Sequence, residues 1–426
     1  MRRTRRVVQL GFLALTLAAV FVVRGNAERW CPFGGVEAAY TYLREGDLTC
    51  SLGVSNFYIL AGVLLVTVLL RRAFCGYMCP IGTISEWLGA AAARLGVRPA
   101  KVPRTLDRTL SLLKYGVLAV ILYFTWRAGE LIFRGFDPCY ALISRHGEDI
   151  TFWAYVVAGG IVLGSLFVTI PFCRWLCPLA AVLNLFSRFG LTRIKRDEAV
   201  CTGCGKCARA CPMAIPVDVL SEVTVARCTS CLNCVAVCPK GAGSATAAES
   251  GGDASADSRR ESRNVSSGAL FWGPPKALGR RWPQAALIAI MLACVVGAVV
   301  AAYAFPIASF THSRGEAPAH TSVLHLRVNG VTCRGAATRF ALYYLDRDDE
   351  FAVPGYLKIE AWPGPGYPNV RITYDPAQTN ELAIKKAITE PYFNTATGHW
   401  DASPFRIEGY DPLGLDEVEA TTKPGA

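Results

Sequence analysis

The sequence predicts an α-helical membrane protein that also carries a cysteine-rich insert and a C-terminal α+β domain. Three observations support this fold class. Of the 426 residues, 52% are hydrophobic and only 18% are charged, whereas soluble domains have about 25% charged residues. Eight of the 17 cysteines fall between residues 201 and 238. The region from residue 320 onward changes repeatedly between strand-like and helix-like apolar patterns.

Five apolar segments are long enough to cross a hydrocarbon core of about 30 Å, which takes roughly 20 helical residues. They lie at about residues 7–23, 54–70, 109–126, 151–170 and 284–305. The first segment follows four arginines, and no small-x-small cleavage site follows it. We therefore expect an uncleaved anchor there rather than a signal peptide. The sequence predicts about five transmembrane helices.

The distribution of charge predicts the orientation of these helices. Residues 320–426 contain 10 Lys+Arg against 14 Asp+Glu, which leaves 34 against 19 in the preceding residues. The cations flank apolar segments instead of forming stripes with aromatic residues, which argues against nucleic-acid binding. By the positive-inside rule, the Arg-rich loops lie in the cytoplasm. We expect a multi-pass protein of the bacterial inner membrane, with a cytoplasmic insert and a periplasmic C-terminal domain.

The cysteine-rich insert contains the same pattern twice. Residues 201–212 read CTGCGKCARACP and residues 228–239 read CTSCLNCVAVCP. This C-x2-C-x2-C-x3-C-P spacing is typical of bacterial ferredoxins with two [4Fe-4S] clusters, in which the fourth cysteine of each run ligates the other cluster. The predicted ligands are Cys201, Cys204, Cys207 and Cys238 for one cluster, and Cys228, Cys231, Cys234 and Cys211 for the other. Zinc knuckles or disulfides are the alternatives, but neither requires this duplicated pattern.

A second repeat occurs where two apolar segments end. The second segment leads into FCGYMCPIG and the fourth into FCRWLCPLA. Two helical hairpins that face one another would bring Cys75, Cys79, Cys173 and Cys177 together at the cytoplasmic surface. Each pair taken alone fits simple packing, because free cysteine is often buried. Four thiolates suit a third Fe-S cluster or a redox dithiol system, so we predict a redox role.

Other polar and aromatic residues lie in the loops predicted outside the membrane. Cys31 and Cys50 fit either a disulfide or two free thiols. His146 lies beside Glu148 and Asp149 and fits either a solvated loop or a proton acceptor for quinol oxidation. Aromatic residues nearby fit interfacial anchors or quinone contacts; they are Trp30, Tyr40, Tyr42, Trp126 and Tyr140.

The C-terminal region has β-α-β-β-α order, and residues 405–407 supply a last strand. This order predicts a ferredoxin-like α+β domain of the βαββαβ type. Cys333 in GVTCRGAA lies between the first strand and the first helix. Because a helix N-terminus lowers the pKa of a thiol, Cys333 is a candidate metal ligand or redox thiol. One thiol alone is a poor site for a soft metal.

These patterns predict five parts of the chain. Residues 241–268 are rich in Gly, Ala, Ser and Asp, which indicates a flexible linker. The predicted parts are a membrane domain with four helices and two hairpins (1–196), a two-cluster ferredoxin domain (197–240), a linker (241–283), a fifth transmembrane helix (284–305) and the α+β domain (320–426).

Residues 30–240 resemble the polyferredoxin membrane proteins typified by NapH and the C-terminal half of NosR. The paired C-x3-C-P motifs precede the eight ferredoxin cysteines in the same order. The resemblance implies that the membrane part accepts electrons from quinol and passes them through Fe-S clusters toward a reductase. The terminal domain is similar to heavy-metal-associated domains, with Cys333 at the first metal-ligand position and Ala336 at the second.

Two functions fit the sequence. None of the five histidines lies in an apolar segment, so transmembrane haem is not expected. The first function is Fe-S electron transfer between the quinone pool and a partner oxidoreductase, as in a quinol dehydrogenase-type subunit. The second is a maturation factor that reduces copper or a disulfide during assembly of a respiratory enzyme.

Overall fold

The chain divides into two compact units. The first combines Met1–Phe33 with Tyr58–Ala301, and the second combines Gly34–Phe57 with Ala302–Ala426. The computed structural model describes residues 2–22, 31–45, 54–97, 100, 102–128, 151–239, 269–274, 282–305, 310–314, 320–331, 334–345, 353–362, 367–394 and 399–412.

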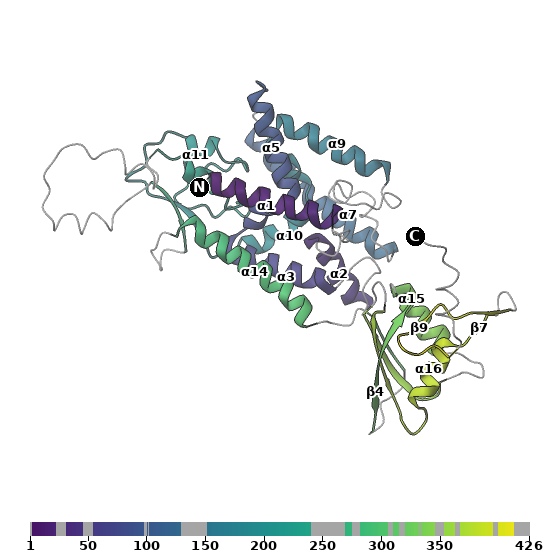
Figure 1. Ribbon diagram of the computed structural model, residues 1–426. Helices are drawn as coiled ribbons and strands as arrows, with labels where there is room; N and C mark the ends of the chain where they lie inside the picture. The colour runs from purple at the N-terminus through teal and green to yellow at the C-terminus, as the bar shows by residue number, and fades with distance from the viewer. Residues whose placement is uncertain are drawn as a thin grey trace, which may run out of the picture. The chain divides into compact units, whose positions relative to one another are not determined.

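Every predicted apolar segment coincides with a helix (Figure 1). These helices are α1 (Arg2–Phe21), α3 (Val54–Leu70), α7 (Leu113–Ala128), α9 (Phe152–Phe167) and α14 (Gln284–Ala304). Between them lie the helices α4 (Ala73–Tyr77), α5 (Pro80–Arg94), α6 (Arg104–Leu110) and α10 (Pro178–Ser187). Three described helical stretches are long and apolar enough to cross a membrane: Arg2–Phe21, Arg104–Arg127 and Gln284–Ala304. The apolar stretches of α3, α9 and α10 are shorter, so five crossings stay a prediction.

The two cysteine hairpins have similar local backbones, although the short turn is α-helical in the first and π-helical in the second. In each, an apolar helix leads into a short helical turn, which is α4 in the first hairpin and η4 (Phe172–Leu176) in the second. The second cysteine of each motif, Cys79 or Cys177, is extended and immediately precedes a helix that begins with proline. Proline favours the first helical position because its φ is already helical and it needs no N–H there. The C-P pair thus ends one turn and begins the next helix.

Small residues let the helices of the first unit approach closely. A Cβ on Gly62 of α3 would lie 2.6 Å from the Cβ of Ala298 on α14. A Cβ on Gly89 of α5 would lie 3.1 Å from the carbonyl oxygen of Ser165 on α9. The hydroxyls of Ser85 and Ser165 hydrogen-bond at 2.6 Å. Such contacts are typical of membrane helix packing, and they join the two hairpins through α5 and α9.

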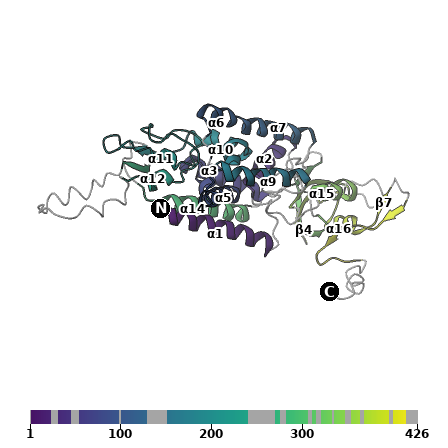
Figure 2. The same cartoon turned by 90° about the horizontal axis from the view of Figure 1, so that it is seen from above.

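The cysteine-rich insert is held by a short sheet. β1 (Arg193–Arg196) pairs antiparallel with β2 (Leu270–Gly273), from Arg193 opposite Gly273 to Arg196 opposite Leu270. β2 lies inside the range predicted as a linker, and its Leu270 and Trp272 are buried. The short helices α11 (Lys206–Arg209) and α12 (Asn233–Ala236) lie side by side in the insert (Figure 2).

The second unit contains a five-stranded antiparallel sheet of order β3-β5-β6-β4-β9. Its strands are β3 (Phe310–Ser313), β4 (Ser322–Asn329), β5 (Tyr356–Ala361), β6 (Asn369–Tyr374) and β9 (Arg406–Ile407). The helical segment α15 (Arg334–Arg339), with its continuation η7 (Phe340–Leu345), and helix α16 (Glu381–Thr389) lie on one face of the sheet (Figure 1). Helix α2 (Pro32–Glu45) also belongs largely to this unit.

The core of this α+β sheet lies between the helices and the sheet. Phe340 of η7, Ile372 of β6 and Ile384 of α16 are fully buried in one cluster. β3 and the small hairpin of β7 (Tyr392–Asn394) with β8 (His399–Asp401) were not predicted from the sequence. Cys333, the candidate metal ligand of this domain, lies outside the described residues.

Candidate iron-sulfur sites

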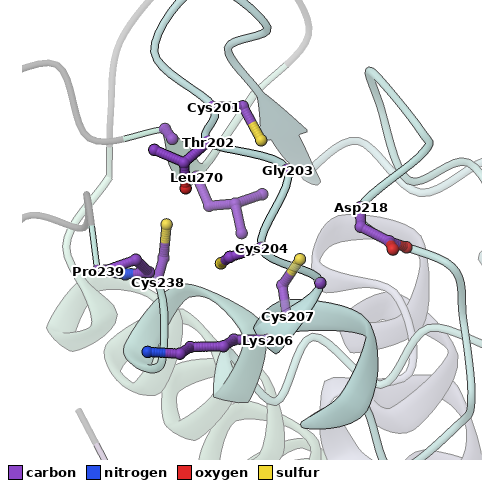
Figure 3. Close-up of a pocket in the computed structure, with 12 residues that line it drawn as sticks. Cys201, Thr202, Gly203, Cys204, Lys206, Cys207, Asp218, Cys238, Pro239 and Leu270 are labelled. Atoms are coloured by element: carbon purple, nitrogen blue, oxygen red, sulfur yellow. The ribbon is translucent and has the colours of Figure 1, made fainter.

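Four cysteines from both ferredoxin motifs line one cavity. Cys201, Cys204 and Cys207 come from the first motif and Cys238 from the second (Figure 3). Leu270 of β2 lines the same cavity, so the strand that returns after the 241–268 segment helps to form it. We call these four cysteines the first cysteine site. Cys204 is exposed to solvent, and a hydrogen bond from the backbone N–H of Lys206 lowers the pKa of its thiol.

The other four ferredoxin cysteines line a second cavity, whose walls are apolar. We call Cys211, Cys228, Cys231 and Cys234 the second cysteine site. Burial raises the pKa of Cys211 to about 12 and holds that of Cys234 well above its usual value. Burial therefore favours the neutral form of these two thiols, so metal binding here releases protons. The apolar walls comprise Ile194, Met213, Ile215, Val217 and Val223.

The two ferredoxin loops have matching backbone conformations. Gly203 and Ser230 hold equivalent positions and have φ of +66° and +45°. Gly205 and Leu232 are also equivalent, with φ of +65° and +57°. The left-handed conformation costs a non-glycine residue about 1–2 kcal/mol. The second loop adopts it twice without glycine, so its shape is imposed by the surrounding site.

The residues of both cavities fit [4Fe-4S] clusters. Each offers four thiols, and backbone N–H groups such as those of Lys206 and Ser230 hydrogen-bond to cysteine sulfurs. Hydrogen bonds to sulfur are among the features that set cluster potentials. In the described part of the chain, no group of three or more Cys, His, Asp or Glu side chains is close enough for a single metal ion.

The structure also brings the hairpin cysteines together. Cys173 interacts electrostatically with Cys75, Cys79 and Cys177. We call these four the hairpin site. Burial, with the neighbouring Cys75, raises the pKa of Cys79 to about 12. A Cβ on Gly82 would lie 3.7 Å from the Cβ of Cys79 and 3.9 Å from the sulfur of Cys173, so the two hairpins face one another here.

The first hairpin packs against the second cysteine site at Gly76, which directly follows Cys75. A Cβ on Gly76 would lie 2.8 Å from the carbonyl oxygen of Thr229 and 3.6 Å from the Cβ of Cys231. The carbonyl oxygen of Gly76 accepts hydrogen bonds from Arg5 Nε and Gln9 Nε2, at 3.0 and 3.1 Å. Helix α1 therefore holds the first hairpin against the second cysteine site.

We expect the substitution Gly76→Ala to lower the thermal midpoint of the first unit. Alanine is the better helix former, but its Cβ cannot approach the Thr229 oxygen to 2.8 Å, and overpacking costs about 1–3 kcal/mol. Circular dichroism of the detergent-solubilised protein measures this change. Gly159→Ala in α9 is the matched control, because a Cβ added there would have no atom within 4 Å. Equal midpoints for the two variants would show that the contact is not tight.

A buried carboxylate joins the second hairpin to the insert. Asp107 of α6 accepts hydrogen bonds from Arg174 and Trp175 of the second hairpin, at 2.5 and 2.9 Å. Its other oxygen accepts from Arg227, which directly precedes Cys228, at 2.6 Å. Sequence reasoning missed this residue. The available signal was that Asp107 is the only acid in the Arg-rich loop at 98–108.

Several other cysteines and candidate residues stand apart from these sites. Cys294 lies on α14 and packs against the apolar core of the first unit. Cys31 is half-buried at the beginning of α2. Other candidates lie outside the described residues, so their predicted roles are untested; they are Trp30, Cys50, Tyr140, His146, Glu148 and Asp149.

Family models match both cysteine regions. A 4Fe-4S binding domain matches twice, at residues 52–99 and 150–197. A 4Fe-4S dicluster domain matches residues 193–244. The first model covers each hairpin once, in agreement with the internal repeat, and the second covers the eight ferredoxin cysteines.

Curated relatives match about half of the chain. The putative electron transport protein YccM of Escherichia coli K12 is 32% identical over 216 residues, 48% of this chain and 59% of YccM. The methylamine utilization ferredoxin-type protein MauN of Methylobacillus flagellatus is 30% identical, covering 49% of this chain and 75% of MauN. The ferredoxin-type protein NapH of Haemophilus influenzae is 26% identical, covering 49% of this chain and 74% of NapH. The chain thus spans less than two thirds of YccM. No solved structure matches the chain.

Proposed function

Because this chain belongs to the NapH/NosR-like family of ferredoxin-type membrane proteins, we propose that it carries electrons between the quinone pool and a partner oxidoreductase. The electrons pass through two [4Fe-4S] clusters, one at the first cysteine site and one at the second. The observation that carries the proposal is that each cavity gathers four cysteines from both motifs. A bound cluster supplies one-electron redox chemistry.

The exposure of the cysteines supports a route for electrons along the protein. Cys204 of the first cysteine site is exposed, whereas Cys228, Cys231 and Cys234 of the second are buried. A partner in solution would exchange electrons at the first site. The second site, which contacts the hairpin through Gly76, would exchange them on the membrane side. The protein's own part is to hold the thiolates, donate N–H groups to sulfur and exclude water from the second site.

The hairpin site is proposed to hold a third Fe-S cluster. Its four thiols interact with one another, and each hairpin lies within a match to a 4Fe-4S binding domain. Two hairpins each supply two thiols, which together give the four ligands of a cubane. The three clusters would then form a continuous route from the membrane edge to the exposed Cys204.

We further propose five membrane crossings, with the ferredoxin insert in the cytoplasm and the α+β domain in the periplasm of a bacterial inner membrane. The arginines that flank the apolar segments support this orientation. The strand order β5-β6-β4-β9, with helical segments after β4 and β6, supports a ferredoxin-like βαββαβ domain similar to heavy-metal-associated domains.

Anaerobic addition of a menaquinol analogue to the purified protein tests this function. We expect about twelve irons per chain if all three sites are filled, and reduced clusters visible by EPR after the quinol is added. A count of about eight irons per chain would contradict the proposed third cluster but agree with the other two. Fully loaded clusters that stay oxidised with quinol but accept electrons from dithionite would contradict the quinol role.

A further inference from the structure

Two adjacent arginines after α3 are completely buried. Arg71 and Arg72 both have 0% exposure. Among the described residues, neither forms an ion pair with a carboxylate, and the Nε atom of each has no hydrogen-bond partner. A buried charge that no opposite charge compensates is strongly destabilising. The pair therefore requires negative charge from another source close by.

The two guanidinium groups face different cysteine sites. Arg72 donates one hydrogen bond to Asn184 Oδ1 at 3.1 Å and approaches the sulfur of Cys75 at 3.9 Å. Its electrostatic neighbours are three of the four hairpin cysteines: Cys75, Cys177 and Cys173. Arg72 is thus associated with the hairpin site.

Arg71 instead faces the second cysteine site. Its guanidinium donates to the carbonyl oxygens of Val223 and Thr224, and its strongest electrostatic partner is the thiol of Cys228. Glu222 also faces it, but that carboxylate lies 3.4 Å from Arg193. Adjacent residues in the chain therefore each place a cation beside one of two neighbouring sites. The buried Lys114 also faces Cys177 of the hairpin site, and the buried Arg5 faces Cys231 of the second site.

This arrangement discriminates between the chemical states of the hairpin site. Four neutral thiols, or two disulfides, would leave Arg72 without a counter-charge. A metal cluster with four thiolate ligands carries net negative charge in both of its oxidation states, and so satisfies the buried cation. The position of Arg72 therefore favours an anionic thiolate cluster over a dithiol system.

We propose that Arg72 and Arg71 are the buried counter-charges of the hairpin site and the second cysteine site, and that each raises the reduction potential of the cluster at its own site. The inference rests on the proposed third cluster for Arg72, and on the cluster proposed at the second cysteine site for Arg71. Reduction adds one electron to an anionic group, and a nearby cation in a low-dielectric interior stabilises that added charge. One electron leaves the reduced cluster of one site and enters the oxidised cluster of the other, and no bond forms or breaks. The packing contact at Gly76 joins these two sites, between which the electron moves.

Potentiometric EPR titration of the full-length protein tests the roles of Arg71 and Arg72. We expect Arg72→Gln to lower the reduction equilibrium constant of the hairpin cluster at least tenfold, a shift of about 59 mV for one electron. Arg71→Gln should do the same to the second cluster, and each variant serves as the control for the other. Arg72→Lys and Arg71→Lys keep the charge and should restore most of the potential. The hairpin signal is identified by its loss in Cys173→Ser.

The outcomes separate this inference from the proposed function. Unchanged potentials in Arg72→Gln protein that retains its iron would overturn the role of Arg72. If Arg72→Gln loses the hairpin iron, retention by Arg72→Lys supports the counter-charge, and loss from both variants contradicts it. A wild-type protein without a hairpin cluster, or with zinc there, would instead overturn the proposed third cluster.

Discussion

We expect the substitution Cys238→Ser to remove the cluster proposed for the first cysteine site, although Cys238 belongs to the second ferredoxin motif. We expect Cys211→Ser to remove the cluster proposed for the second cysteine site, although Cys211 belongs to the first motif. This crossed result is expected because Cys238 lines the cavity of Cys201, Cys204 and Cys207, and Cys211 lines that of Cys228. A cubane that loses one of its four thiolates is bound far less firmly. We expect each variant to lose about four irons per chain.

EPR spectra of the reduced variants decide which cluster is lost. The signal missing from Cys238→Ser should match the one missing from Cys201→Ser, and Cys211→Ser should match Cys228→Ser. Cys294→Ser is the control, since Cys294 lines neither ferredoxin cavity, and it should keep all of the iron. The proposed ligand sets would be wrong if Cys238→Ser matched Cys228→Ser.

Local spacing explains how the sequence can predict which ferredoxin cysteines gather in each cavity. The C-x2-C-x2-C turns are built from consecutive residues, so their geometry is contained in the motif. Even here, the sequence predicts only part of the backbone. Gly203 and Gly205 are typical of left-handed turns, whereas Ser230 and Leu232 adopt the same conformation without any sign in their residue type.

Contacts between residues far apart in the sequence could not be predicted from the sequence. Arg71 and Arg72 contribute to the predicted orientation of the membrane helices, but their burial depends on packing with residues more than a hundred positions away. β2 lies after a stretch of linker-like composition, and only its pairing with β1 brings Leu270 to the first cysteine site. In the α+β unit, the predicted strands β4, β5 and β6 have six to eight residues, whereas β7 and β8 have three residues each, too few for a pattern to emerge. The two-residue β9 was predicted as the last strand of the βαββαβ order.

Asp107→Asn should destabilise the first unit by about 3–5 kcal/mol, the range for removing one partner of a buried ion pair. The amide keeps the size of the carboxylate but leaves the charge of Arg174 uncompensated, and both side chains are less than a tenth exposed. Arg227 also loses its partner. Because Arg227 directly precedes Cys228, we expect the second cysteine site to lose its iron more readily as well. The thermal midpoint and the rate of iron release to a chelator measure the two effects.

An exposed ion pair in the same unit provides the matched control for Asp107→Asn. Glu198 contacts Arg196 at 2.8 Å, close to the 2.6 Å between Asp107 and Arg227, but its side chain is 65% exposed. Exposed pairs contribute at most about 1 kcal/mol, so Glu198→Gln should scarcely change the midpoint. The double variant Asp107→Asn/Arg174→Gln removes both buried charges and should recover part of the loss. Equal effects of Asp107→Asn and Glu198→Gln would mean that contact distance, rather than burial, decides how much these ion pairs contribute.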